Sequence, residues 1–163
     1  MSYDIQHGVA EFHKKFGHPV RDGLSIPEET EGRMALEFIH EEVWELQEAL
    51  IHSEFVECGE PACCSEYRET YDPDLIEVAD ALGDIVFVAY GMALRFGIDL
   101  DRVLAAIVES NMTKEPNGQG KIKKGEDYVP PKIAEALGFT PESELTQEGF
   151  FAIPGLTEGK LAA

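Results

Sequence analysis

The chain has 163 residues and a hydrophobic content of 44%, which suits a single folded domain with a sizeable core. Its formal net charge of -19 comes from 13 Lys and Arg against 32 Asp and Glu, and it argues against broad contact with polymeric nucleic acid or an anionic membrane. An anionic substrate would therefore need a metal ion or a local basic patch. The polar N-terminal segment lacks the pattern of a signal peptide, so we expect a cytoplasmic protein.

Two helices are predicted in the first third of the chain. Apolar residues recur at helical spacing over residues 5–16, and Gly17 follows them, which predicts a short amphipathic helix. A second helix is predicted from about residue 27 to residue 53, with Ser25 as its N-cap.

The second predicted helix carries acids within its apolar side. At about 100° per residue, Glu42 and Glu45 point into an apolar arc, and Glu41 lies near the edge of that arc. Ionised groups in such a position are costly unless a positive charge lies beside them. The apolar arc consists of Met34, Ala35, Phe38, Ile39, Leu46, Ala49 and Leu50.

The segment 54–72 keeps no clear hydrophobic period and contains Gly and Pro, so we interpret it as an inserted loop. It contains all three cysteines of the chain, Cys58, Cys63 and Cys64. An odd count without paired CxxC units favours free thiols over disulfides or a structural zinc site. The sequence does not assign a role to this insertion.

A third helix is predicted over residues 73–96, with Asp72 as its N-cap. It is apolar enough to suggest a membrane span, but acids in its first half make insertion costly, so we interpret it as a buried core helix. These acids are Glu77, Asp80 and Asp84, and they share one sector of about 60° around the helix axis.

Neither of these two acidic stripes contains a basic residue, although a solvated helix face normally mixes Lys, Arg, Gln and Ser with its acids. We therefore favour a shared cation over the alternative that each stripe is the solvated side of an amphipathic helix. Oxygen ligands favour Mg²⁺, or Mn²⁺, over zinc, and Mg²⁺ commonly completes its shell with water and substrate phosphate. The stripes thus indicate phosphate chemistry.

A fourth helix is predicted over residues 100–112, with Asp99 as its N-cap. Beyond it, Asn117 and Gly118 favour a tight turn within a loop or short hairpin. The lysines of this segment either bind phosphates or belong to a solvated loop. They are Lys114, Lys121, Lys123 and Lys124.

The predicted fold class is all-α. We expect an antiparallel bundle of four to five helices over residues 1–139, with a C-terminal loop or short hairpin and a short helix over 132–137. Residues 140–163 lack a periodic core pattern and are interpreted as a C-terminal tail. Exposed apolar area on the first and fourth helices predicts that subunits pack together, as a homodimer or a dimer of dimers.

Four segments resemble the MazG-like all-α nucleoside triphosphate pyrophosphohydrolases. EEVWE over 41–45 is similar to the ExxE element of that family, and EVADALGD over 77–84 is similar to its ExxD element. SNMTK over 110–114 and KIKKGEDYVPP over 121–131 resemble the downstream segments of some members, and the similarity extends to phosphoribosyl-ATP pyrophosphohydrolases. The stretch between the two acidic elements is longer than this family usually has, because of the Cys-bearing insertion.

The resemblance implies metal ligands, a catalytic residue and substrate contacts. Glu41 would orient or deprotonate the attacking water, or act as a further ligand, and Asp84 would support or extend the ligand set. The implied Mg²⁺ ligands are Glu42, Glu45, Glu77 and Asp80. The implied substrate contacts are Asn111 and Lys114, with Lys121, Lys124 and Tyr128 as weaker candidates.

The implied activity converts a nucleoside or deoxynucleoside triphosphate to its monophosphate and pyrophosphate, as nucleotide-pool housekeeping. One alternative keeps the fold and takes phosphoribosyl-ATP as substrate. Another is a non-catalytic acidic helical module that binds a basic partner. That module predicts acids outside the apolar arc, whereas Glu42 and Glu45 lie inside it.

Overall fold

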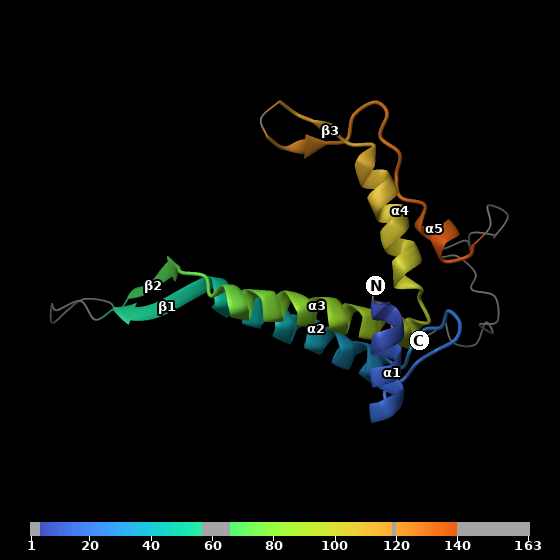
Figure 1. The fold of residues 1–163 in the computed structure, drawn as a ribbon, viewed down its shortest axis with the longest axis horizontal. Helices are drawn as coiled ribbons and strands as arrows, with labels where there is room; N and C mark the ends of the chain where they lie inside the picture. The colour runs from blue at the N-terminus through green and yellow to red at the C-terminus, as the bar shows by residue number, and fades with distance from the viewer. Residues whose placement is uncertain (1–3, 57–65, 119, 140–163) are drawn as a thin grey trace. The chain divides into compact units, whose positions relative to one another are not determined.

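The computed structural model describes residues 4–56, 66–118 and 120–139. These residues contain five helices and two small antiparallel sheets, so the all-α prediction is confirmed (Figure 1). The chain divides into two compact units, one made of Glu28–Met92 and the other of Met1–Pro27 with Ala93–Ala163. Each unit is described by itself.

The unit Glu28–Met92 is a helical hairpin. Helix α2 spans Glu29–Leu50, and helix α3 spans Leu75–Phe96, of which the part up to Met92 belongs to this unit. The two helices run antiparallel and are joined through a β-hairpin (Figure 1). Where the helices meet the β-hairpin, the backbone N–H of Asp74 donates a hydrogen bond to Ala49 O at 3.0 Å.

Helix α2 is shorter than predicted at both ends. It begins after Glu28, whose side chain makes no capping hydrogen bond, and it ends at Leu50 because the backbone of Ile51 is extended. Ser25, the predicted N-cap, instead donates its backbone N–H to Phe96 O at 3.0 Å within the other unit.

The predicted loop over 54–72 begins and ends in strands. Strands β1, Ile51–Val56, and β2, Glu66–Tyr71, pair antiparallel, with Ile51 opposite Tyr71. Strand pairing joins residues that are distant in sequence, so a search for local period does not find it. Residues 57–65, which include the three cysteines, lie outside the described part of the chain.

Helix α3 begins two residues later than predicted. The side chain of Asp74, not that of Asp72, accepts hydrogen bonds from Ile76 N at 2.8 Å and Glu77 N at 3.3 Å. A carboxylate at this position satisfies backbone donors that have no partner in the first helical turn.

The prediction of a buried core helix is wrong for the first half of α3. Leu75 and Ile76 are 78% and 79% exposed in the single chain, and Leu82 and Val86 are also exposed. Among the described residues no single helix is long and apolar enough to cross a membrane, and α3 with α4 meets that criterion only as a bent pair, by length and composition.

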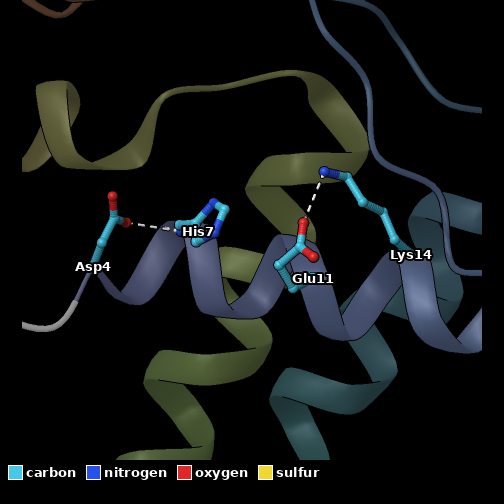
Figure 2. A network of polar contacts seen from close by, with 4 residues as sticks. All are labelled: Asp4, His7, Glu11 and Lys14. Carbon is cyan, nitrogen blue, oxygen red and sulfur yellow. Dashed lines mark hydrogen bonds and ion pairs between the residues drawn. The ribbon is translucent and has the colours of Figure 1, made fainter.

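The other unit begins with helix α1, Ile5–Phe16, which has the predicted bounds. Asp4 accepts a hydrogen bond from His7 N at 2.8 Å, and Lys14 pairs with Glu11 at 3.0 Å on the exposed side (Figure 2). Gly17 ends the helix in the left-handed conformation.

Helix α4 spans Leu100–Met112 and is capped by Asp99, which accepts from Arg102 N at 3.1 Å, as predicted. A short hairpin of β3, Glu115–Pro116, and β4, Ile122–Lys123, follows it, and helix α5 spans Ile133–Ala136. Residues 140–163, interpreted as a tail, lie outside the described residues.

Gly97 ends α3 at a crowded left-handed turn. Its φ is +65°, and a Cβ there would collide with the backbone carbonyl of Gly23. That carbonyl cannot easily move, because neighbouring backbone groups bind the end of α3 on both sides: Arg21 N donates to Leu94 O, and Ser25 N to Phe96 O.

We expect Gly97→Ala to lower the free energy of unfolding by about 2–4 kcal/mol, since it adds a steric clash to an unfavourable φ. Gly17→Ala is the matched control, because Gly17 has a φ of +73° but no neighbouring atom within 4 Å of the position that a Cβ would take. It should cost only about 1 kcal/mol. Urea denaturation of both variants checks this, and equal costs would show that the Gly23 contact contributes nothing.

His13 is a buried titratable group of α1, with only 5% of its surface exposed. Its Nδ1 lies 3.1 Å from Pro19 O, and its ring lies 5.3 Å from that of His18. Burial lowers the pKa of His13, the hydrogen bond to Pro19 opposes this effect, and the charges of Arg95 and His18 lower the pKa further.

Because the pKa of His13 is lower in the folded than in the unfolded protein, the unfolded chain binds the proton first as pH falls. His13 should therefore reduce stability as pH drops below about 6.5, down to its folded pKa. We expect His13→Gln to flatten the fall in Tm between pH 7 and pH 5.5. His7→Gln, at an exposed position of the same helix, should keep the wild-type slope. Parallel slopes for all three proteins would contradict this assignment.

Candidate functional site

The acids of both predicted stripes, on α2 and α3, belong to the unit Glu28–Met92, and all of them except Glu42 are exposed in the single chain. Glu42 on α2 is half-buried, and burial raises the pKa of its carboxyl group. The charges of Glu45, Asp84, Glu41 and Asp80 raise it further, in that order. Because Asp80 and Asp84 belong to α3, their effect on Glu42 shows that carboxylates of the two helices share one electrostatic environment.

Glu45 and Glu77, the two remaining acids of the stripes, line one cavity of about 470 Å³. This cavity lies at the end of the helical hairpin where β1 begins and β2 ends. The pairing follows from antiparallel packing, since residues later in α2 lie beside residues earlier in α3. The other lining residues are Glu48, Ala49, His52, Asp72 and Asp74.

The charges of Glu45, Asp80 and Asp84 thus act on Glu42, and Glu45 shares a cavity with Glu77. Glu41 is exposed, and so are the predicted ligands other than Glu42. In the described ranges, no three His, Cys, Asp or Glu side chains converge closely enough to form a finished metal site. The donors on α2 and α3 are all carboxylate oxygens. Their chemistry fits Mg²⁺ or Mn²⁺.

Sequence reasoning missed His52. It lies on the wall of the same cavity as Glu45 and Glu77, at the start of β1. The sequence predicts a continuous helix at this position, which does not indicate that the side chain lies beside the acids. The strand that begins at Ile51 places it there.

The substrate candidates lie in the unit that contains α4. Asn111 is exposed and Lys114 is half-buried, both at the end of α4. Lys124 Nζ lies 4.8 Å from the ring centre of Tyr128, in cation–π contact. Hydrogen bonding by Ser110 lowers the pKa of Tyr128, burial opposes it, and the charges of Lys124 and Lys114 lower it further.

Lys124 thus contacts Tyr128, and the charge of Lys114 also acts on the phenol. These interactions do not include Lys121, whose side chain is exposed and whose backbone N–H donates to Asn117 Oδ1 at 3.0 Å in the hairpin turn. Lys123 pairs with Glu115 at 3.9 Å. Of the lysines in the described part of this segment, Lys124 is the one in direct contact with the Tyr128 ring.

Sequence reasoning also missed Ser110 and Thr113. Both lie in the SNMTK segment, in which the resemblance assigns a role only to Asn111 and Lys114. Ser110 is 4% exposed, and its hydroxyl donates to Val129 O at 2.7 Å. Sequence spacing gives no signal for this contact, because it joins residues 19 positions apart.

Comparison with known proteins identifies the family. Residues 9–111 match the family model of phosphoribosyl-ATP pyrophosphohydrolase. A curated but uncharacterized protein of Acanthamoeba polyphaga mimivirus is 33% identical over 97 residues, which cover 57% of this chain and 31% of that protein. The match with the family model includes both acidic stripes and more than half of the chain. The chain belongs to the phosphoribosyl-ATP pyrophosphohydrolase family.

Proposed function

We propose that this chain is a Mg²⁺-dependent nucleotide pyrophosphohydrolase that converts a nucleoside or deoxynucleoside triphosphate to its monophosphate and pyrophosphate. One observation carries the proposal: carboxylates of both helices act on Glu42, in a chain of this family. Such a concentration of negative charge is unfavourable by itself and becomes favourable around a divalent cation.

Glu42, Glu45, Glu77 and Asp80 would hold the cation, with Asp84 beside Asp80 as a supporting group. A bound Mg²⁺ would neutralise charge on the phosphates of the substrate. The protein's contribution is to hold the carboxylates on two rigid helices, so that they need little rearrangement when the cation binds.

Glu41 is the proposed general base, which is the role that the family resemblance implies, and its carboxylate is accessible to water. It would accept a proton from water as the water oxygen bonds to the α-phosphorus of the α–β anhydride. The bond from that phosphorus to the bridging oxygen breaks, and pyrophosphate leaves with the electron pair. Lys114 and Lys124 would neutralise negative charge on the polyphosphate.

We expect Glu41→Gln to lower kcat for pyrophosphate release by roughly 10²–10⁴-fold, because the amide cannot accept the proton. Cation binding should persist, as measured by the rise of Tm on addition of Mg²⁺. A wild-type kcat in this variant would remove Glu41 from the mechanism. Loss of the Mg²⁺-dependent shift would make Glu41 a ligand instead.

Phosphoribosyl-ATP, after which the matching family is named, is the second candidate substrate. Hydrolysis of its α–β anhydride would use the same groups. The test is a panel of nucleoside and deoxynucleoside triphosphates together with phosphoribosyl-ATP, each with and without Mg²⁺, scored as kcat/KM. Activity on phosphoribosyl-ATP alone would select this second function, and a panel without any pyrophosphate release would contradict both.

We also propose that the chain is a homodimer or a dimer of dimers. On α3, Leu75, Leu82 and Val86 are exposed and lie on the side of the helix opposite Glu77, Asp80 and Asp84. A second copy that covered this stripe would remove apolar surface from water without blocking the acids. Exposed apolar residues also occur on α4, namely Leu104, Val108 and Met112.

A further inference from the structure

The end of α4 binds a distant segment of the chain through two hydroxyl groups. Ser110 Oγ donates to Val129 O at 2.7 Å, and Val129 N donates to Thr113 Oγ1 at 2.9 Å. Thr113 Oγ1 in turn donates to Ser110 O at 2.8 Å. Both backbone polar groups of Val129 are therefore satisfied by side chains of residues 110 and 113, which we call the hydroxyl latch.

The latch acts on a segment with little other regular structure. Pro130 and Pro131 follow Val129 and have no N–H groups, so this stretch cannot continue as a helix. Val129 is 48% exposed, yet its N–H and carbonyl find their partners on side chains 16 and 19 residues away. The position of Val129 therefore depends on Ser110 and Thr113.

Val129 directly follows Tyr128, so the latch also fixes Tyr128. The hydroxyl of Tyr128 lies 3.4 Å from Ser110 Oγ, and its N–H donates to Gly125 O at 3.3 Å, which closes the turn that carries Lys124. Lys124 Nζ lies 4.8 Å from the Tyr128 ring centre. The latch thus determines where this ammonium group lies relative to the end of α4, where Lys114 is found.

Lys124 lies against the ring of Tyr128, and the charge of Lys114 also acts on this phenol, in a chain with a net charge of -19. The neighbouring Lys123 instead pairs with Glu115, and both lysines line a hollow that also contains Glu115, Glu126 and Asp127. A pair of like charges fixed in this way suits a ligand with adjacent negative charges, and the phosphates of a nucleotide are such a ligand. The family match ends at Asn111, so the match itself does not assign a role to Thr113, Lys124 or Tyr128.

We propose that Ser110 and Thr113 are positioning residues for nucleotide binding: their hydroxyls hold Val129, and through it Tyr128 and Lys124, beside Lys114, so that the two ammonium groups meet the polyphosphate as a preformed pair. This inference rests on the proposed function. A preformed pair binds more tightly because less conformational freedom is lost when the ligand arrives. The latch residues touch neither the substrate nor the cleaved bond.

The latch should therefore affect KM and leave kcat nearly unchanged. Thr113→Val keeps the shape of the side chain but removes the acceptor for Val129 N, and we expect KM to rise roughly 10-fold. Thr113→Ser keeps the hydroxyl and should restore the wild-type KM. Ser110→Ala should act in the same direction as Thr113→Val. Thr30→Val, which removes an exposed hydroxyl from α2, should leave KM unchanged.

Two measurements that need no turnover separate this inference from the proposed function. Hydrogen exchange at Val129 N–H should speed up in Thr113→Val, and the affinity for inorganic triphosphate, measured by calorimetry without a divalent cation, should fall about 10-fold. If the wild type hydrolyses no nucleotide but these two effects appear, the proposed function fails and the positioning role stands. If exchange speeds up while KM and triphosphate affinity stay at wild-type values, or if kcat alone falls, the positioning role is overturned.

Discussion

Glu42→Gln is expected to abolish Mg²⁺-dependent pyrophosphate release while raising the stability of the metal-free protein. Glu42 is half-buried, and the charges of four other carboxylates, on α2 and α3, raise its pKa. Its neutral analogue removes one proposed ligand and also relieves repulsion in the absence of a cation. Activity should fall more than about 100-fold. The Tm in EDTA should rise.

This prediction is specific because activity should fall while the Tm of the metal-free protein rises. A residue that merely supports the fold would lose stability and activity together when replaced. Glu37→Gln is the matched control, because Glu37 lies on the exposed side of the same helix and is absent from the groups that act on Glu42. It should change neither quantity. Retention of Mg²⁺-dependent turnover by Glu42→Gln, or a lower metal-free Tm, would count against the proposed role.

Leu82→Asp is expected to dissociate the oligomer. Leu82 is 49% exposed in the single chain and belongs to the apolar stripe of α3 that points away from the acids. Burying a carboxylate in a subunit interface would cost about 2–4 kcal/mol, which raises the dissociation constant roughly 30- to 1000-fold. Size-exclusion chromatography with light scattering, over a range of protein concentrations, measures this change.

Leu82→Met is the control for that experiment, since it keeps an apolar side chain of similar volume and should preserve the oligomer. The secondary structure of Leu82→Asp, followed by circular dichroism, should remain helical because the substituted position is exposed in the single chain. A wild-type protein that is monomeric at every concentration would refute the oligomer itself. If the oligomer mass of Leu82→Asp is unchanged, the subunit interface lies on another surface.

Helix ends were predictable where one residue dominates the local energetics. Gly17 adopts the left-handed conformation that ends α1, and Asp99 caps α4, both as expected. The starts of α2 and α3 were misplaced because several residues compete there. Asp72 and Asp74 are both suitable caps by residue type, and the strand that ends at Tyr71 decides in favour of the later one.

In the candidate site, too, local relations were predictable from the sequence and relations between distant residues were not. Helical spacing alone placed Glu77, Asp80 and Asp84 on one side of α3, because that relation is local. Two other relations depend on how the helices and the β-hairpin pack. The charges of Asp80 and Asp84 act on Glu42, and His52 lines one cavity with Glu45 and Glu77. The contacts of Ser110 and Thr113 with Val129 are equally remote in sequence, so no local pattern indicates them.

The measurement that bears most directly on the central claim is Mn²⁺ binding, followed by electron paramagnetic resonance, to the wild type, Glu42→Gln, Asp80→Asn and the double variant. If α2 and α3 hold one cation together, either single substitution should largely abolish binding, and the double variant should lose little more. If both single variants bind Mn²⁺ as the wild type does, or if the two losses simply add, the carboxylates of the two helices do not form a shared cation site.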